Sequence, residues 1–406
     1  MSVKKRLFNP FLFIIAKMLL SSQHLRYMKK ILILFILLFS FQSVFAQLNF
    51  LPKFIRQMYF KKDSTRKPSF VLLPALSSAP ETGLEFGGAA LLSFYTDTLG
   101  HDTRVSSLFG YSTITTKGQA KLSLNANYWT PQNKFHYTGV ISYYNYPFSF
   151  YGIGNNTKLS ALDHVAEKRY KVGITGEKRF GDYFYLGYVA GVIKYFYRYD
   201  PNPNSTINAD PAVQDGHGGA SAYIGPSFTF DTRNNNTYTT RGMVISSYYN
   251  IMHGTYANNS YRGGFFNIEY SQFFLLARKL VLGVDIQEQS LTGGRSPFYL
   301  LPQMGSDEMM RGYYQGRYRD RNYIAGQTEL RYRVDNRFGI VGFVGTGEVF
   351  HSAFSTEQLK PNYGGGVRYF FDVEKGLAIR LDYGVGQKPQ GEKRESGFYI
   401  ALGQSF

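Results

Sequence analysis

The stretch PQMGSDEMMRGYYQGRYRDRNYIAGQTELRYRV, residues 302–334, decides the fold of this chain. A loop rich in Gly, Tyr and Arg leads directly into a segment in which apolar and charged residues alternate. Side chains alternate between the two faces of a β-strand, so Ile324 and Leu330 share one face while Glu329 and Arg331 share the other. A lipid bilayer favours the first face and a water-filled lumen favours the second. The stretch therefore predicts one strand of a transmembrane β-barrel.

The composition agrees with a barrel. The 406 residues include 34 Tyr, 35 Phe and no Cys. Aromatic residues suit strands and the girdles at the two membrane interfaces. After the N-terminal region no segment reaches about 18 uninterrupted apolar residues, which excludes a bundle of membrane helices. The lack of cysteine excludes disulfides and cysteine-ligated metals.

The formal net charge is +17, and seven positive charges precede residue 47 without an acid, which leaves +10 after it. This excess has two readings: loops and lumen walls biased toward Arg and Lys, or contact with anionic lipid headgroups. Nucleic-acid binding needs a basic patch on a compact module, and the sequence shows no such module.

Residues 28–46, MKKILILFILLFSFQSVFA, predict a secretory signal peptide. Two lysines precede an apolar run, and Val-Phe-Ala precedes Gln47. We expect cleavage near Ala46 and export to the outer membrane of a Gram-negative cell.

Residues 1–27 contain a poorer apolar patch, and we interpret them as an extension ahead of a true start at Met28. A second membrane anchor is the alternative. Residues 47–67 are predicted to form a short periplasmic segment, as an amphipathic helix or a disordered tether.

Residues 68–406 are predicted to form a sixteen-stranded antiparallel barrel, because alternating segments are separated by turn signals. The expected strands are 69–76, 83–95, 103–114, 119–129, 134–146, 167–179, 183–198, 219–231, 241–253, 261–273, 279–290, 323–333, 338–350, 362–373, 377–387 and 396–406. Barrels have short periplasmic turns and longer outer loops. The long connections all fall after odd-numbered strands, as this count requires: 147–166, 199–218, 291–322, 351–361 and 388–395.

The last expected strand, 396–406, is amphipathic and ends in phenylalanine. Its alternation assigns Phe398, Ile400, Leu402 and Phe406 to one face. Such an ending is similar to the signal by which barrel-assembly machinery accepts its clients.

The tripeptide Arg311-Gly312-Tyr313 resembles the loop tip of the BamA/TamA superfamily of outer-membrane barrels, the bacterial surface antigen family. In that family the loop enters the lumen, and its arginine pairs with acids on strands twelve and thirteen. The resemblance implies that Arg311 pairs with Glu329, since a desolvated guanidinium needs carboxylate acceptors. A tyrosine-rich loop lying on the outer surface is the alternative.

The second acceptor departs from the family pattern. The family has Phe-x-Asp-x-Gly on strand thirteen, and the corresponding Asp is Gly345 here. Glu348 lies on the opposite face by parity. The loop is therefore expected to be held by one carboxylate and looser, or to use Asp382 as well.

A second motif lies between the eighth and ninth expected strands. Asp231, Arg233, Thr240 and Gly242 match the family turn Asp-x-Arg…Pro-Thr-x-Gly, although the usual proline is Thr239. The alternative is an unspecialised Asn-rich hairpin.

Pro74 lies within the first expected strand. Proline cannot donate a ladder hydrogen bond and is confined to edges or strand ends. Pro74 is thus expected to reduce the backbone hydrogen bonding at the seam, the junction between the first strand and the strand ending at Phe406. Barrels of the resembled family open sideways at this junction. A frayed strand end is the alternative.

The resemblance implies a role in inserting or translocating proteins, or lipids, at the outer membrane. Client outer-membrane proteins and a periplasmic partner are the implied partners, besides membrane lipid. BamA-like proteins usually carry periplasmic POTRA domains, for which residues 47–67 are too short, so a passive channel or structural barrel is the alternative.

An enzyme is not expected, and neither is a cofactor or a metal. The histidines lack metal-ligand spacing, and no nucleophile elbow, P-loop or HExxH motif is present. An outer-membrane lipase is the enzymatic alternative, and it would need a Ser/His pair that the sequence does not place.

Overall fold

The computed structural model describes residues 66–79, 83–97, 103–213, 216–256, 259–294 and 296–406. The expected extension at 1–27, the signal peptide at 28–46 and all but the end of the 47–67 segment lie outside these residues.

The described chain forms sixteen strands. They are β1 (Ser69–Ala79), β2 (Gly83–Phe94), β3 (Ser106–Thr115), β4 (Ala120–Trp129), β5 (Phe135–Phe150), β6 (Asp163–Phe180), β7 (Phe184–Arg198), β8 (Gly218–Asp231), β9 (Gly242–Tyr256), β10 (Asn259–Ala277), β11 (Leu280–Thr292), β12 (Asn322–Arg333), β13 (Phe338–Phe350), β14 (Lys360–Asp372), β15 (Leu377–Val385) and β16 (Ser396–Leu402). Each strand pairs antiparallel with the next, so the order in the sheet is the order in the chain. The predicted all-β, sixteen-stranded architecture is confirmed.

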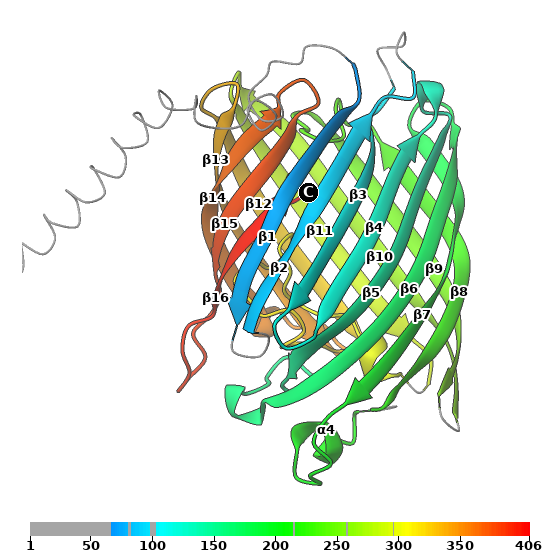
Figure 1. The fold of residues 1–406 in the computed structure, drawn as a ribbon, viewed down its shortest axis with the longest axis vertical. Helices are drawn as coiled ribbons and strands as arrows, with labels where there is room; N and C mark the ends of the chain where they lie inside the picture. Colours follow the sequence, from blue (N-terminus) through cyan, green and yellow to red (C-terminus); the bar gives the residue numbers. More distant parts are fainter. Residues whose placement is uncertain (1–65, 80–82, 98–102, 214–215, 257–258, 295) are drawn as a thin grey trace, which may run out of the picture. The chain divides into compact units, whose positions relative to one another are not determined.

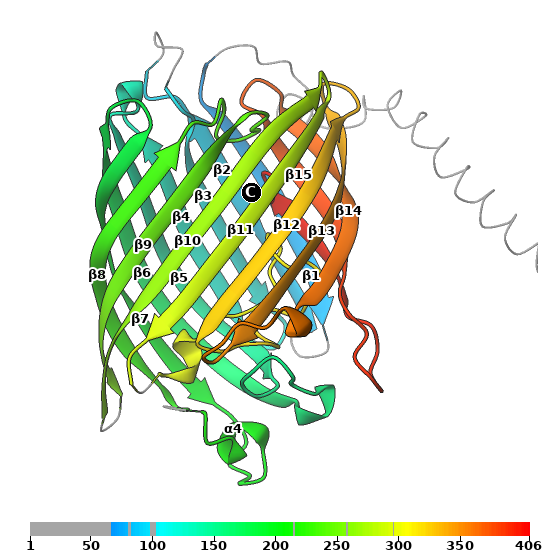
Figure 2. The same ribbon diagram turned by 180° about the vertical axis from the view of Figure 1, so that it is seen from behind.

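The sheet curls into a barrel, and its two end strands β1 and β16 border the place where no ladder closes the sheet (Figure 1, Figure 2). Between the described residues of β1 and β16 there is no ladder of the kind that joins every other neighbouring pair. Pro74 lies in β1, is exposed, and stands opposite Gly88 of β2.

The two faces of each strand separate as the alternation predicts. On β12, Glu329 is 0% exposed inside the barrel while Leu330 is 43% exposed on the outer wall. On β4, Ser123 is buried between the exposed Leu122 and Leu124. Polar side chains therefore fill the lumen, and apolar side chains form the surface that a bilayer would cover.

The long connections lie at one end of the barrel, the lower end in Figure 1. They are residues 151–162, 199–217, 293–321, 351–359 and 386–395. We call this the long-loop end and the opposite one the turn end. Short helices are confined to connections: Pro131–Asn133, Leu159–Ala161, α4 (Thr206–Ala209), Phe298–Leu300 and Thr356–Gln358. In the part of the chain that the structure describes, no helix combines the length and hydropathy needed to cross a membrane.

The prediction for the last strand is wrong at its end. β16 stops at Leu402, because Gly403 takes a left-handed conformation with φ of +83° that ends the extended run. Phe406 therefore does not share the lipid face with Phe398, Ile400 and Leu402. Its ring centroid lies 5.8 Å from that of Phe273 on the lumen side of β10. In both views the C-terminus falls within the outline of the barrel (Figure 1, Figure 2).

Phe406 can reach the far wall because Gly283 of β11 has no side chain there. A Cβ atom at Gly283 would lie 2.8 Å from the Phe406 ring. We call residues 403–406 the tail. The tail leaves the seam at Gly403 and crosses the lumen, so Phe406 is not a residue of the seam.

Candidate functional site

The candidate site is built around the connection between β11 and β12, residues 293–321, which we call the lumen loop. Its first part packs a short helix, Phe298–Leu300, against the inner wall. The Phe298 ring lies 5.6 Å from Phe150 of β5 and 5.1 Å from Tyr197 of β7. These aromatic contacts bury the start of the loop inside the long-loop end of the barrel.

The tip of the lumen loop carries Arg311, which is completely buried. Its Nη2 donates to Oε2 of Glu329 at 2.9 Å, and its Nη1 donates to Oδ2 of Asp382 at 2.7 Å. Gln327 accepts a longer third bond at 3.3 Å. The lumen loop is thus held by carboxylates of β12 and β15, whereas the resemblance implied a second acceptor on β13.

The backbone of the tip lies directly against β15 and the residue that follows it. A Cβ atom at Gly384 would lie 2.5 Å from the Arg311 carbonyl carbon, so only glycine permits this approach. Gly312 has φ of +110°, and a Cβ atom there would lie 2.8 Å from the backbone of Val385 and Gly386. The glycine in Arg-Gly-Tyr is therefore required both by its conformation and by the space available.

Tyr313, the third residue of the Arg-Gly-Tyr tip, is held by two hydrogen bonds to the barrel. Its hydroxyl donates to the Pro361 carbonyl at 2.6 Å and accepts from the Gln387 N–H at 3.0 Å. Burial raises the pKa of Tyr313 above its ordinary value of 10.0, so the phenol stays a hydrogen-bond donor. The side chain ties the loop to the long-loop ends of β14 and β15.

Gly345 lies beneath the tip, at the position where the family has an aspartate. A Cβ atom at Gly345 would lie 2.6 Å from Oδ1 of Asn362, which occupies this space from β14. The Nδ2 of Asn362 donates to the Arg311 carbonyl at 3.0 Å. The Arg311 guanidinium stacks 3.5 Å above the Phe343 ring. An amide contact to the loop backbone and a cation–π contact thus stand where the second family carboxylate would be.

Three further arginines surround the same two carboxylates. Arg331 donates to Glu329 at 2.8 Å, and Arg368 donates to Asp382 at 2.5 Å. Arg380 bonds Asp382 at 3.3 Å and also pairs with Asp307 of the loop at 2.6 Å. We call this the arginine network: Arg311, Glu329, Arg331, Arg368, Arg380 and Asp382. Shared charge-assisted bonds keep buried charges satisfied.

The arginine network was only partly visible in the sequence. Strand parity already assigns Arg331 and Arg380 to the lumen face, and so many inward arginines require carboxylates. That signal points to Asp382, which also faces inward on β15. Nothing in the local pattern indicates Ser405, whose hydroxyl donates to Glu329 at 3.0 Å from the tail.

The second motif forms the β8–β9 turn, residues 232–241, at the turn end. The Asp231 carboxylate accepts three bonds from Arg233, of which the shortest is 2.8 Å, and one from Arg104. Gly242 begins β9 with φ of +96°, and Thr240 accepts a side-chain bond from Asn234 at 2.9 Å. The motif residues therefore cap the two strand ends and shape the turn between them.

A protein-family sequence model, described as the Omp85 superfamily domain, matches residues 104–406, which is well over half of the chain. The chain belongs to the Omp85 superfamily. The resemblance to BamA-type barrels drawn from the sequence is thereby confirmed. No curated protein matches the chain at the level of sequence.

Solved structures resemble the chain at low identity. CdiB from Acinetobacter baumannii is 12% identical with a TM-score of 0.51, covering 83% of this chain and 59% of that one. CdiB from Escherichia coli is 8% identical with a TM-score of 0.50, covering 85% and 63%. BamA from Haemophilus ducreyi lacking POTRA domains 1-3 is 14% identical with a TM-score of 0.49, covering 84% and 71%. The chain thus spans about three fifths of the CdiB structures.

In this Omp85 barrel the β8–β9 turn also reaches across the turn end. Asn236 donates to the Val105 carbonyl at 3.0 Å, on the β3 side. Thr237 donates to the Lys375 carbonyl, and the Tyr238 ring lies 5.1 Å from Phe370, both on the β14–β15 side. The turn consequently covers part of the mouth, which the sequence did not predict.

A second ion-pair cluster closes the long-loop end, and we call it the loop latch: Arg317, Glu392 and Glu395. Arg317 of the lumen loop donates to Glu392 at 2.5 Å and pairs with Glu395 at 2.8 Å, both in the connection before β16. Glu392 also accepts from the Leu159 N–H at 2.7 Å, and Tyr318 donates to Glu395 at 2.8 Å. The latch joins three connections, and no sequence motif indicated it.

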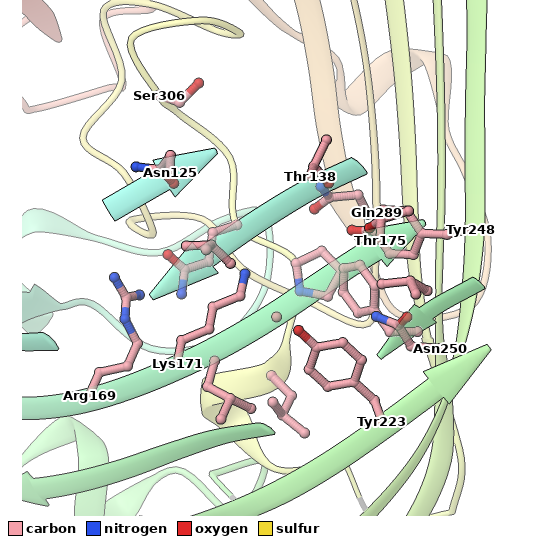
Figure 3. A pocket seen from close by; sticks show the side chains of 18 of the residues that line it. Asn125, Thr138, Arg169, Lys171, Thr175, Tyr223, Tyr248, Asn250, Gln289 and Ser306 are labelled. Carbon is pink, nitrogen blue, oxygen red and sulfur yellow. The ribbon is translucent and has the colours of Figure 1, made fainter. Parts of the chain in front are cut away.

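A cavity of about 860 Å³ lies beside the lumen loop, and we call it the chamber (Figure 3). It lies between the inner walls of β3–β12 and the part of the lumen loop that includes Ser306 and Gln315. Amide, hydroxyl and tyrosine side chains dominate its lining, together with Arg169 and Lys171 of β6. The interior is therefore divided into a filled half around the arginine network and an open, polar half.

Proposed function

We propose that this Omp85 barrel inserts or translocates proteins, or lipids, at the outer membrane. The observation that carries the proposal is the filling of its interior. The lumen loop is anchored at Arg311, the tail crosses to Phe406, and the β8–β9 turn covers part of the turn end. A passive pore needs an open lumen, whereas an insertion machine needs a route sideways through its wall.

The junction of β1 and β16 is the proposed route. Pro74 removes one N–H donor from β1, and the tail leaves β16 after Leu402, which shortens the seam. Exposed strand edges template pairing with new strands. A client strand would therefore add to an edge of this seam, and client outer-membrane proteins would be the partners.

We place the protein in the outer membrane after cleavage near Ala46, with the long-loop end outside. Lipid and a periplasmic partner complete the assembly, and no enzymatic activity, cofactor or nucleic acid is involved. Mass spectrometry of the N-terminus from fractionated membranes tests this placement. A mature protein that starts near Gln47 is expected, and residues 1–27 retained in the inner membrane would contradict it.

Disulfide locking of the seam tests the mechanism. The chain has no cysteine, so every disulfide would come from an introduced pair. Cysteine pairs are scanned between residues 70–74 of β1 and 398–402 of β16. The control pair replaces Leu72 and Ala90, which stand opposite each other on β1 and β2 away from the seam.

Folding of a denatured client barrel into proteoliposomes is measured before and after reduction, with conductance recorded in parallel. Loss of client folding in the seam pairs alone, reversed by reductant, supports the proposal. Full client folding in a locked seam refutes it.

A passive channel is the second candidate, and the open chamber is the observation in its favour. A channel uses its lumen and needs no lateral exit. A passive channel should show steady conductance that neither the seam disulfides nor the control disulfide changes. The protein without a disulfide should also fail to accelerate the folding of the client.

A further inference from the structure

We infer that the chamber is a binding site for an acidic saccharide, a mono- or disaccharide that carries a phosphate or carboxylate group. The volume of about 860 Å³ is in the range of small-molecule sites, which are commonly about 300–1,000 Å³. The inference needs only the folded barrel and does not depend on the proposed insertion activity.

The charge of the chamber selects an anion. Arg169 and Lys171 lie two residues apart on the same face of β6, so their cationic groups enter the chamber together (Figure 3). Glu167 lies 3.8 Å from the Arg169 guanidinium and also accepts from the Tyr197 hydroxyl at 3.1 Å. Lys171 has no hydrogen-bond or ion-pair partner among the described residues. One positive charge therefore remains uncompensated at this wall.

The rest of the lining is neutral. No aspartate or glutamate is among the described residues that line the chamber. The other polar side chains are amides and hydroxyls, contributed by Asn125, Thr138, Thr175, Gln289, Ser306 and others. Such groups donate to and accept from the hydroxyls of a sugar. The anion would thus meet one cationic wall, with the polyhydroxyl part of the ligand facing the amides.

Asn250 on β9 provides an independent sign of a missing partner. The residue is only 8% exposed, lines the chamber, and its Oδ1 has no hydrogen-bond donor among the described groups. A buried acceptor left without a donor destabilises the protein, because it has lost its hydrogen bond to water and gained none in return. A ligand hydroxyl would supply that donor.

Tyr223 provides an aromatic surface between the two polar regions. A Cβ atom would lie 2.7 Å from the Tyr223 hydroxyl at Gly173 and 2.4 Å from it at Gly191, so these two glycines make room for the ring. In Figure 3 the side chain extends into the chamber between Lys171 and Asn250. The C–H face of a sugar ring packs well on such a surface.

Calorimetric titration of the purified full-length barrel in detergent tests the site. The probes are glucose 6-phosphate, galacturonate, glucose and inorganic phosphate. We expect glucose 6-phosphate or galacturonate to bind at least tenfold more tightly than glucose and than phosphate. Equal affinity for phosphate and glucose 6-phosphate, with weak galacturonate, would reduce the site to a bare anion site and overturn the saccharide assignment. Absence of binding by all four would overturn the inference entirely.

Variants then assign the roles. Lys171→Gln should weaken binding of the acidic sugar at least tenfold, whereas Lys168→Gln should leave it unchanged. Lys168 lies on the same strand but on the exposed outer face, so the charge change is matched. Asn250→Ala should weaken the acidic sugar without changing the affinity for phosphate. Equal effects of the two lysine variants would overturn the assignment. Lys171→Met replaces Lys171→Gln if that variant does not fold.

Discussion

Arg331 holds Phe406 by two contacts: its Nη2 donates to the Phe406 backbone oxygen at 3.0 Å, and its guanidinium lies 4.5 Å from the ring centroid. The same Arg331 donates to Glu329, the carboxylate that anchors Arg311. The tail and the lumen loop therefore share one buried network. A substitution that displaces the tail should therefore also disturb the anchoring of the lumen loop, and the reverse.

Gly283→Val should release the tail without unfolding the barrel. A Cβ atom at Gly283 would meet the Phe406 ring at 2.8 and 3.0 Å, and this ring is at the end of a movable tail. Carboxypeptidase should then remove Phe406 several-fold faster, as measured by mass spectrometry. Gly342→Val is the control, because a Cβ atom at this strand glycine has nothing within 4 Å. Equal digestion of the two variants would show that the tail is not seated on β11.

Neutralising Glu329 should destabilise the folded protein more than neutralising its ion-pair partner Arg311. Four buried arginines share the carboxylates of Glu329 and Asp382, so Glu329→Gln leaves the excess positive charge poorly paired. Unpairing a buried charge costs about 3–5 kcal/mol, and lumen water would reduce this. Arg311→Gln leaves both carboxylates with other arginines and should lower the free energy of unfolding by only about 1–2 kcal/mol, as loss of charged hydrogen bonds does.

Denaturant titration in lipid vesicles measures these free energies of unfolding. Arg262→Gln, an exposed arginine on β10, serves as the control and should change little. A larger loss for Arg311→Gln than for Glu329→Gln would contradict the charge balance assigned to the network.

Restoring the family aspartate should be destabilising in this chain. Gly345→Asp would place a side chain against Asn362 Oδ1 and the Gly326 carbonyl, 2.6 and 2.8 Å from its Cβ atom. Overpacking of this kind costs about 1–3 kcal/mol. Asn362→Ala should recover part of the loss when combined with Gly345→Asp, while it should destabilise the parent on its own because it removes the bond to Arg311. Additive losses in the double variant would argue against compensation between β13 and β14.

The loop latch should respond differently to its two carboxylates. Burial alone would raise the pKa of Glu392, but the Leu159 N–H and the Arg317 guanidinium outweigh it, so the pKa lies below its ordinary value of 4.5. Burial raises the pKa of Glu395. Glu392→Gln should therefore loosen the loops at neutral pH, whereas Glu395→Gln should be tolerated. Trypsin cleavage near Lys388 and Lys393 reports loop opening.

The pH dependence follows from the direction of these shifts. A carboxylate whose pKa is lowered in the folded state stabilises it above its ordinary pKa, and this stability is lost as pH falls through the lowered value. The Glu392 contribution should be complete at pH above about 4.5, should decrease as the pH falls below that value, and should be lost once the pH has passed through the lowered pKa. Glu395, whose pKa is raised, takes up its proton at a higher pH than Glu392, and this protonation stabilises the folded state. The latch should therefore stay closed when Glu395 titrates, and it should open only at the lower pH at which Glu392 is protonated. Opening between pH 6 and 7 would be inconsistent with Glu392 as the main anchor.

The sequence by itself determined the sheet. Each strand has one face toward lipid and one toward the lumen, so alternation at positions such as Glu329 and Leu330 reports the environment of each residue locally. A slip of one residue would reverse both faces, which is why the inward and outward residues of each strand, and the count of sixteen strands, could be predicted. The pairing of Arg311 in the Arg-Gly-Tyr tip with Glu329 could be predicted as well, because the tip resembles a family motif.

Only the tertiary structure decided which lumen residues meet. Asp382, Ser405 and Phe406 are far from Glu329 along the chain, and nothing in local periodicity says which inward side chains face each other across a curved sheet. Gly283 leaves room for Phe406, and Asn362 fills the space above Gly345, only because distant strands approach there. The physical reason is that alternation encodes a one-dimensional choice between two faces, whereas contacts across the lumen depend on the curvature and stagger of the whole barrel.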